Sequence, residues 1–492
     1  MRGRSSRIST ALAVGACLSL VAAACGDDDD GGGAATTGAA PATTGGAATT
    51  GAPATTAAPA TTGAPATTGA PATTGAATTA APGTTTGGEG AAFQVPTDNC
   101  PPDATEPLAD GEPIKIAFIG PQTGPLAAFG VIGQGMKIYF DKINANGGID
   151  GHQIELVTKD DAYDPAKSAP AVQEALEGDK VFASVFQVGT PNVAGTRQLY
   201  ADACVPQALV GTGFPAWGDP QNWPWTTGGI PSYNVESKVW IDFIKEKFPD
   251  AKRLALLSYN NDFGKVYQTQ INELAPENGM EVVADVLHEA TSDLTNEVTQ
   301  LLASNPDVIL GGTTSTFCTT LMTLARQGGF TGPIINSYTC QAIEQFMVPA
   351  GDAAANVHTL VVQKDPADPA YADDPGMQQY MADVEQYGAG VDPTVGNVAT
   401  GWTAGFLTED ALNRAVEMDG GLTRANLMNA FWSFDVTPPL ALGGVAHVDG
   451  TTDAYIAEYG VMAEYDPAST SYKVADGVTI DVEGQGGLYS GG

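Results

Sequence analysis

Two short polar turns are the segments of this chain best suited to hold a small solute. Gly189-Thr190 and Gly211-Thr212-Gly213 each follow an apolar run with the length of a buried strand. Open parallel sheets bind ligands at the carboxyl ends of their strands. Backbone N–H groups at the start of the next helix, with a threonine hydroxyl, can hold a carboxylate or another acceptor. The turns therefore predict a binding site, although an ordinary threonine-capped loop is the alternative for each turn taken alone.

Motifs for covalent or metal chemistry are absent from the sequence. It has no G-x-S-x-G, no H-E-x-x-H, no C-x-x-C and no Walker A loop. Its histidines, His152, His288, His358 and His447, are far apart in the chain. We therefore expect no enzyme activity, no cofactor and no metal site.

The charge of the chain excludes two classes of partner. Its 492 residues include 21 Lys and Arg against 56 Asp and Glu, a formal net charge of -35. Nucleic acids and anionic lipid surfaces attract basic proteins, so neither is an expected partner. The excess acid is best explained by a solvated exterior.

The N-terminal region has the features of an exported protein. Arg2, Arg4 and Arg7 precede an apolar run, residues 11–24, which is too short to span a membrane but typical of a secretory signal. Small residues directly precede Cys25. Residues 1–25 therefore resemble a lipoprotein signal peptide that leaves Cys25 lipid-modified and the protein attached outside the cytoplasm. The alternative is plain cleavage that leaves Cys25 free.

The composition of residues 26–98 predicts a tether between the N-terminal end and a folded region. Repeats of the form GAPATT recur at six-residue spacing from Gly51 onward. A segment of Gly, Ala, Thr and Pro with almost no large apolar side chain cannot offset the entropy of ordering. We expect residues 26–98 to be disordered.

The folded region opens with a strand, a helix and a second strand. Residues 114–119 form an apolar run that ends at Gly120-Pro121, and apolar residues recur every three or four positions over 132–143. A further apolar run covers residues 154–157. Similar alternation continues for two successive sets, which predicts an α/β protein with two parallel sheets.

The same region carries a family resemblance. GPQTGPLAAFG, INANGGIDG and DDAYDPAK, in this order and spacing, resemble the opening of bacterial leucine/isoleucine/valine-type periplasmic solute-binding proteins of ABC transporters. The resemblance implies two doubly wound lobes with a hinge and an interlobe cleft. It implies a first lobe of residues 99–230 with about 356–438, and a second lobe of residues 231–355 with about 439–485.

The resemblance also implies a set of ligand contacts. The two turns match segments that grip the ligand's carboxylate, and Phe129 and Phe263 match aromatic residues around the ligand. Tyr233 lies close to the first crossover between the lobes and could line the rim of the cleft. Further polar residues follow strands of the second lobe. The complete predicted set is Phe129, Gly189, Thr190, Gly211, Thr212, Gly213, Tyr233, Phe263, Thr313, Thr314, Tyr338 and Thr339.

One departure from the family bears on the ligand. Amino-acid binders carry an acidic residue that pairs with the ligand's ammonium, and Thr339 stands near that place here. A buried ammonium without a carboxylate partner is costly, so an amide or an organic acid suits the site better than an α-amino acid.

The expected function is capture of a small polar solute (amino acid, amide or organic acid) by lobe closure. The expected protein is a monomer that delivers its solute to an ABC permease and touches the membrane only through its lipid. The alternative is an extracellular sensor on the same fold, and a secreted hydrolase is disfavoured because no nucleophile stands beside a placed base.

Four cysteines remain in the folded region, and they allow three pairings. An exported location favours disulfides over free thiols. We expect Cys318 to pair with Cys340, because both should lie at the ends of adjacent strands, and Cys100 to pair with Cys204. Four buried free thiols are the alternative.

Overall fold

The computed structural model describes residues 93–483. The predicted signal peptide, Cys25 and residues 26–92 of the predicted tether lie outside the described residues. Residues 93–98 of that tether are ordered, contrary to expectation: Val95 is buried and its N–H donates to Asn429 Oδ1 at 2.8 Å. Both expected disulfides are present, Cys100–Cys204 and Cys318–Cys340.

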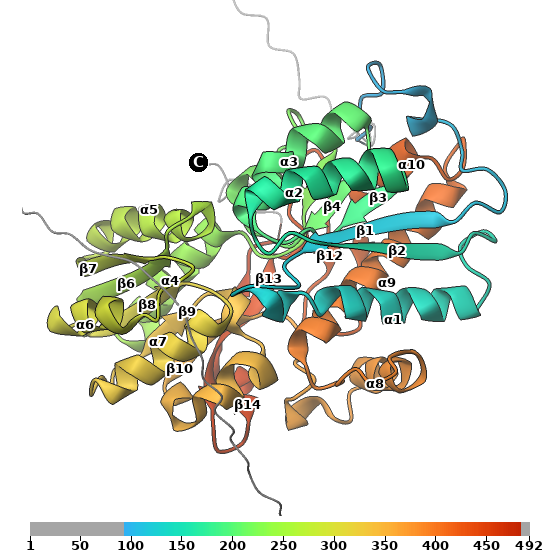
Figure 1. The fold of residues 1–492 in the computed structure, drawn as a ribbon. Helices are drawn as coiled ribbons and strands as arrows, with labels where there is room; N and C mark the ends of the chain where they lie inside the picture. The colour runs from blue at the N-terminus through green and yellow to red at the C-terminus, as the bar shows by residue number, and fades with distance from the viewer. Residues whose placement is uncertain (1–92, 484–492) are drawn as a thin grey trace, which may run out of the picture. The chain divides into compact units, whose positions relative to one another are not determined.

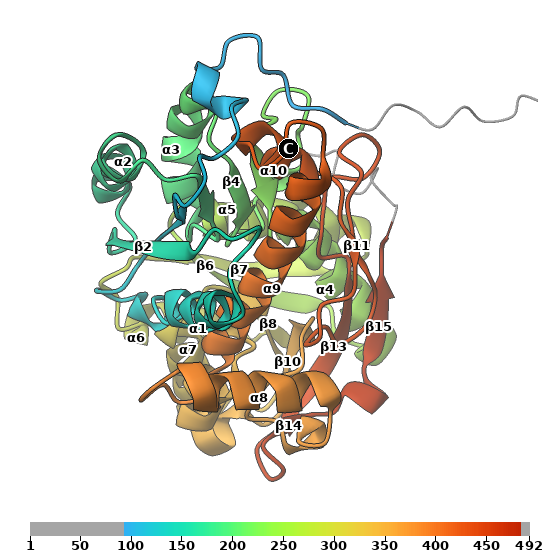
Figure 2. The same ribbon diagram turned by 90° about the vertical axis from the view of Figure 1, so that its right-hand side faces the viewer.

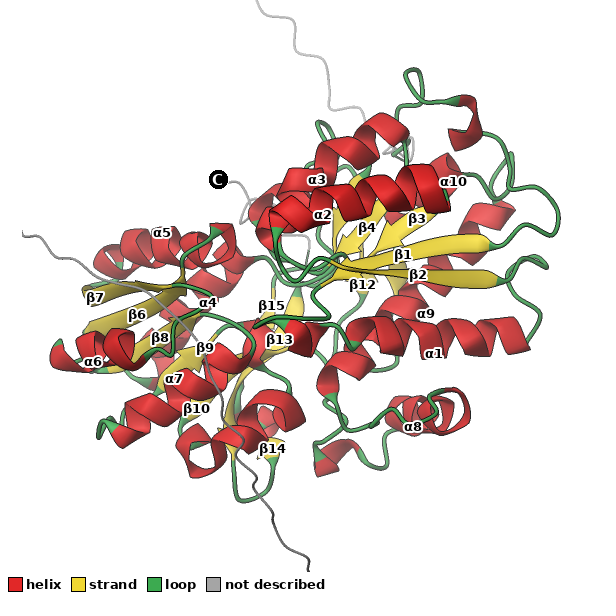
Figure 3. Cartoon of the chain, in the orientation of Figure 1, coloured by secondary structure: helices red, strands yellow, loops and turns green. Residues whose placement is uncertain are grey.

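The first sheet is wholly parallel, with strand order β2-β1-β3-β4-β5. β1 is buried along nearly its whole length because helices cover both faces of the sheet, as Figure 3 shows. The strands are β1 (Ile114–Gly120), β2 (Ile154–Asp160), β3 (Ala183–Val185), β4 (Gln207–Val210) and β5 (Thr226–Gly228).

In the view of Figure 1, α2 and α3 lie above the first sheet and α1 lies below it. These helices are α1 (Ile132–Ala145), α2 (Pro165–Gln173) and α3 (Thr190–Ala203). Asp164 caps α2, since its side chain accepts a hydrogen bond from Ala166 N. Pro170 lies inside this helix and does not delay its start. After Gln173 the chain continues as a π-helical turn, Glu174–Asp179.

Helices from the C-terminal part of the chain complete the covering of the first sheet. They are α8 (Pro375–Tyr387), α9 (Gly396–Glu417) and α10 (Arg424–Phe431). Figure 2 shows α9 running beside α1. Their backbones touch: a Cβ added at Gly135 would collide with the Val398 carbonyl, and one at Gly401 with the Ile132 carbonyl. Glycine at these positions allows the close packing of α1 against α9.

The second sheet has strand order β14-β13-β10-β9-β8-β6-β7, with β15 also paired to β13. β13 runs antiparallel to β10, so this sheet is mixed and not wholly parallel as predicted. The strands are β6 (Arg253–Tyr259), β7 (Glu281–His288), β8 (Val308–Gly312), β9 (Ile334–Asn336), β10 (Val357–Val361), β13 (Tyr459–Asp466), β14 (Ser471–Tyr472) and β15 (Val478–Asp481). Its helices are α4 (Tyr233–Lys247), α5 (Asp262–Glu277), α6 (Thr295–Ala303) and α7 (Thr316–Gln327).

The chain passes between the two sheets three times: between β5 and α4, between β10 and α8, and between α10 and β13. A small hairpin of β11 (Asp435–Val436) and β12 (Ala446–His447) lies on the last of these passages. Two sheets joined by three crossing segments can move relative to one another when only those segments bend.

Candidate functional site

A cavity lies where the loops of both sheets meet. It encloses about 680 Å³, open mouth included. Its wall is mostly apolar and aromatic, with a small number of polar groups, which is the usual character of a small-molecule site. The lining residues are Leu126, Phe129, Ile132, Tyr163, Phe186, Val188, Gly189, Gly211, Ile230, Tyr233, Phe263, Thr314, Tyr338, Thr339, Gln341, Ala342, Gln363, Asp365, Gly396, Asn397 and Thr400.

Most of the predicted site residues line this cavity, and they come from both sheets. Gly189 and Gly211, which follow the third and fourth strands, provide backbone on one side, and Tyr338 and Thr339 follow β9 on the other. The predicted residues on the wall are Phe129, Gly189, Gly211, Tyr233, Phe263, Thr314, Tyr338 and Thr339.

The remaining predicted residues lie behind the wall. Thr190 Oγ1 and Thr212 Oγ1 are buried and 2.5 Å apart, so the two hydroxyls hydrogen-bond each other. The two threonines come this close because they follow β3 and β4, which are neighbouring parallel strands. Gly213 uses its carbonyl to accept from Tyr233 N at 2.7 Å. Thr313 Oγ1 hydrogen-bonds His288 Nε2 at 2.8 Å.

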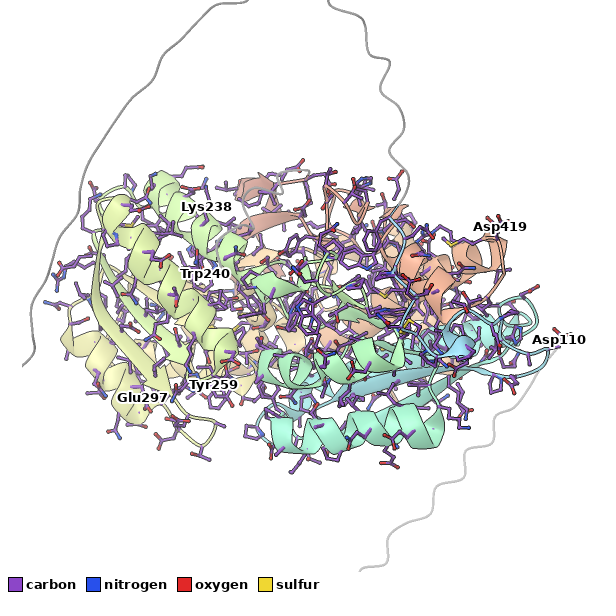
Figure 4. The ribbon with its side chains drawn as sticks, turned by 90° about the horizontal axis from the view of Figure 1, so that it is seen from above. Asp110, Lys238, Trp240, Tyr259, Glu297 and Asp419 are labelled. Carbon is purple, nitrogen blue, oxygen red and sulfur yellow. A yellow bond between two sulfur atoms is a disulfide. The ribbon has the colours of Figure 1, made fainter. Side chains whose placement is uncertain are left out.

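Tyr163 is a lining residue that the sequence reasoning missed. Its ring packs on Gly189, where an added Cβ would come within 2.7 Å of a ring carbon. The ring also stacks on Tyr259 of the second sheet, with centroids 6.3 Å apart and planes 14° apart; Figure 4 labels Tyr259. Burial raises the pKa of Tyr163 well above its usual range, although the N–H of Thr190 donates to the hydroxyl. The Tyr163 hydroxyl therefore occupies the start of α3, where a carboxylate was expected to bind.

Two carboxylates hold the turn that carries Tyr163. Ala162 and Tyr163 have φ of 50° and 60°, a left-handed conformation that costs most residues free energy. Asp160 Oδ1 accepts from Ala162 N at 2.9 Å and from Gln122 N at 2.9 Å. Asp161 accepts from Tyr163 N through Oδ1 and from the Asn192 amide through Oδ2. The acidic pair thus stabilises a strained turn and does not face the cavity.

Asp365 is a second lining residue that sequence reasoning missed. It follows β10 at one of the crossings and is 5% exposed. Its Oδ2 accepts from Ile343 N at 3.0 Å and its Oδ1 from Ala367 N at 2.9 Å. Burial raises the pKa of Asp365 to about 7, and the two N–H donors only partly oppose that rise. A carboxyl group that would lose its proton when a cationic ligand binds beside it therefore lies in the cavity wall. Its only signal in the sequence was its position just after a buried strand.

Another buried acid supports the wall from behind. Glu236 of α4 is fully buried; it accepts from Tyr267 Oη at 2.6 Å and from Tyr338 N at 2.5 Å. Burial raises the pKa of Glu236 to about 7, against these hydrogen bonds. The acid thereby fixes the backbone of Tyr338, whose side chain lines the cavity.

The cavity wall carries no basic side chain. Among its lining residues the polar groups are hydroxyls, amides and Asp365, with no Lys, Arg or His. An anionic ligand would have to rely on N–H and O–H donors, whereas a cationic group would find a carboxylate.

A second cavity of about 720 Å³ adjoins the first, open mouth included. Apolar residues from the last crossing, such as Ala441 and Ile456, form part of its wall. The two cavities share the lining residues Phe186, Ile230, Tyr338, Gln363 and Thr400.

Contacts between the two halves close the first cavity on one side. Gln345 lies in the π-helical turn Ile343–Met347, after β9. Its amide donates to the Ala128 carbonyl at 2.9 Å and its Oε1 accepts from Asn397 N at 3.0 Å. The Ser315 hydroxyl donates to the Pro125 carbonyl at 3.2 Å. These bonds join loops of the second sheet to loops and helices packed on the first.

A ligand cavity between two α/β halves joined by three crossings defines the type I periplasmic binding fold. A sequence profile of the periplasmic binding protein family matches residues 113–460. The chain belongs to this family, as its opening motifs predicted.

Individual relatives agree with that assignment. A leucine-, isoleucine-, valine-, threonine- and alanine-binding protein of Pseudomonas aeruginosa is 28% identical over 226 residues, which is 45% of this chain and 60% of that protein. A Leu/Ile/Val-binding protein of Escherichia coli is 32% identical over 96 residues, 19% of this chain and 26% of that protein. The match thus spans less than two thirds of these relatives.

Solved structures show the same fold. A branched-chain amino acid ABC transporter protein from Thermus thermophilus with bound valine aligns with a TM-score of 0.67 at 18% identity, over 76% of this chain and 97% of that one. A fatty acid ABC transporter substrate-binding protein from Thermomonospora curvata aligns with a TM-score of 0.64 at 20% identity, over 76% and 94% of the two chains. No helix within residues 93–483 is long and apolar enough to cross a membrane.

Proposed function

We propose that this protein captures a small organic solute outside the cytoplasm and delivers it to an ABC permease. In this proposal residues 1–25 are a signal peptide, Cys25 carries the lipid anchor, and residues 26–92 connect it to the lobes. The sequence placed residues 99–230 with about 356–438 in the first lobe and residues 231–355 with about 439–485 in the second. Because β10 (Val357–Val361) pairs within the second sheet, the second lobe extends to Val361 and the first lobe resumes after it. The protein acts as a monomer without catalysis.

The observation that carries the proposal is a cavity walled by both sheets and closed by hydrogen bonds between them. A ligand that contacts both walls stabilises the closed arrangement, since it makes more contacts there than with either half alone. The permease would then recognise the closed form. No lining residue combines a nucleophile with a neighbouring base, which favours binding over catalysis.

The proposed ligand has an apolar body and one polar end. Phe129, Phe186 and Phe263 offer an apolar surface, and Asp365 offers a partner for an ammonium or an amide N–H. Asp365 thus supplies, at another position in the wall, the acidic group that is absent near Thr339. Relatives named for leucine, isoleucine and valine support an amino acid with an apolar side chain, and the fatty-acid-binding neighbour supports an acid with an apolar chain.

A panel of four related compounds tests the head group. Leucine carries an ammonium and a carboxylate. Leucinamide has a neutral amide in place of the carboxylate, isopentylamine has no group in that place, and 4-methylpentanoic acid lacks the ammonium. Calorimetric titration of each compound should give saturable binding to leucine and leucinamide. It should give affinity at least about tenfold weaker for the acid, because one charge-assisted hydrogen bond contributes about 1.5–3 kcal/mol.

The variant Asp365→Asn separates the two head groups. It should weaken the binding of leucine, leucinamide and isopentylamine, which carry an ammonium, and leave the binding of 4-methylpentanoic acid, which carries none, unchanged. Tighter binding of the acid than of leucine by the unaltered protein would show that Asp365 is not the ligand's partner. Failure of all these compounds and of longer fatty acids to bind would overturn the proposed solute class.

A further inference from the structure

Three side chains that are distant in sequence meet near the end of the described chain. His447 lies in β12, Asp453 in the loop that leads to β13, and Glu483 two residues beyond β15. One potential ligand atom of each lies within 4.8 Å of the other two. Figure 2 shows β15 beside the segment that carries β11, the hairpin partner of β12.

Asp453 is the buried member of this cluster, at 6% exposed. Its Oδ1 accepts from Tyr455 N at 3.2 Å. Its Oδ2 is buried, and no N–H group among residues 93–483 donates a hydrogen bond to it. Only Glu483 could donate to this oxygen, and only if its own carboxyl group were protonated. An ionised carboxylate oxygen in this situation is costly unless a proton or a cation compensates it.

The loop holds Asp453 in place independently of the cluster. Asp449 Oδ1 accepts from Asp453 N at 2.8 Å, and the Asp453 carbonyl accepts from Asp449 N at 3.1 Å. The carboxylate is therefore presented by a preformed turn, which lowers the entropy cost of binding an ion.

The surroundings add negative charge to the cluster. None of the Lys or Arg ion pairs in the described part of the chain involves Asp453 or Glu483. Asp435 Oδ1 lies 3.8 Å from His447 Nδ1, which brings a third carboxylate close. A carboxylate beside a ligating histidine is a common arrangement in metal sites, because it orients the ring.

We propose that His447, Asp453 and Glu483 bind one divalent transition-metal ion of the Zn²⁺ type. One imidazole and two carboxylates are a ligand set that Zn²⁺ accepts, whereas Mg²⁺ and Ca²⁺ prefer oxygen ligands only. Glu483 is exposed, so water can complete the coordination. The competing explanation is a proton shared by the two carboxyl groups, which would not involve His447.

Such an ion would join the C-terminal strand of the second sheet to the last crossing segment. Glu483 follows β15, and His447 and Asp453 lie on the passage from α10 to β13. The ion would therefore stabilise this part of the molecule without touching the solute cavity. This inference does not depend on the proposed function.

Zinc titration of the untagged full chain tests the site. The protein is stripped with a chelator, transferred to metal-free buffer and titrated with ZnCl₂ by calorimetry. One Zn²⁺ ion should bind per chain, and saturating zinc should raise the melting temperature. His447→Ala and Glu483→Gln should each weaken zinc binding at least about tenfold, since each removes one ligand.

Asp476→Asn is the matched control, because it removes an exposed carboxylate that is outside the cluster. It should leave the affinity for zinc unchanged. Since His447 and Glu483 are at least partly exposed, their variants should fold, which circular dichroism verifies. No saturable zinc binding, or equal binding by His447→Ala and the unaltered protein, would overturn the proposal and leave a shared proton as the explanation.

Discussion

At the scale of single residues, two buried acids behave differently from the many acids on the surface. Glu236 and Asp365 are both buried, and burial raises the pKa of each to about 7. Both accept backbone N–H groups that position the cavity wall. Each is therefore protonated in the folded protein at a pH where the same side chain is ionised in the unfolded chain.

Glu236 leads to a prediction about pH. Its pKa is about 7 when folded and 4.5 when unfolded, so its contribution to stability is full below pH 4.5 and is lost as the pH rises to 7. The loss amounts to about 3 kcal/mol. Glu236→Gln does not titrate and keeps an oxygen for Tyr338 N. Urea unfolding at pH 5 and pH 7.5 should therefore show the variant gaining stability relative to the unaltered protein as the pH rises.

The exposed Glu246 on the same helix provides the control for that experiment. Glu246→Gln should have the same difference in unfolding free energy from the unaltered protein at both pH values. A constant stability difference between Glu236→Gln and the unaltered protein would mean that Glu236 does not titrate in this range.

At the scale of elements, the two disulfides brace different parts of the fold. Cys100–Cys204 fastens the segment before β1 to the end of α3, away from the cavity. Cys318–Cys340 fastens α7 to the 3-10 turn Tyr338–Cys340, which carries two lining residues. The first bond closes a much longer loop than the second.

Removal of each disulfide should therefore affect stability and binding differently. Cys100→Ser with Cys204→Ser should lose about 4–5 kcal/mol of stability by the chain-entropy estimate and keep its affinity for the best compound of the panel. Cys318→Ser with Cys340→Ser should lose about 3 kcal/mol and bind that compound roughly tenfold more weakly, because Tyr338 and Thr339 lose their brace. Denaturant unfolding and calorimetry measure the two effects. Equal losses of affinity in both double variants would contradict this assignment.

At the scale of the whole molecule, closure depends partly on a residue that does not line the cavity. Gln345 joins Ala128 and Asn397 across the two halves, and it is not a lining residue. In an open form water would satisfy the same groups. The two hydrogen bonds therefore favour the closed form selectively.

Gln345→Leu should weaken the best panel compound by about tenfold, since loss of the two bonds costs about 1–2 kcal/mol in the closed form alone. Small-angle scattering should show that the variant needs more ligand to reach the compact form. Gln327→Leu, at an exposed position that ends α7, is the control and should leave both measurements unchanged. An unaltered affinity for Gln345→Leu would mean that these contacts persist in the open form.

Local rules accounted for most of the elements. The strands at 114–120 and 253–259 and the capped helix at Pro165 follow from apolar runs, Asp164 and the glycine stops, all of which act within a few residues. The same is true of the glycine-ended strands that place Gly189 and Gly211 on the cavity wall. The predicted ligand contacts themselves remain predictions.

The sequence by itself determined the element types, the family and the residues close to the strand ends, because these depend on periodicity, capping and short motifs. Only the tertiary structure decided which side chains face the cavity. Tyr163 reaches it through a left-handed turn, Asp365 through a crossing segment, and Thr190 and Thr212 turn toward each other. The same holds for the His447, Asp453 and Glu483 cluster. Such meetings depend on distances between segments far apart in the chain, which no local pattern encodes.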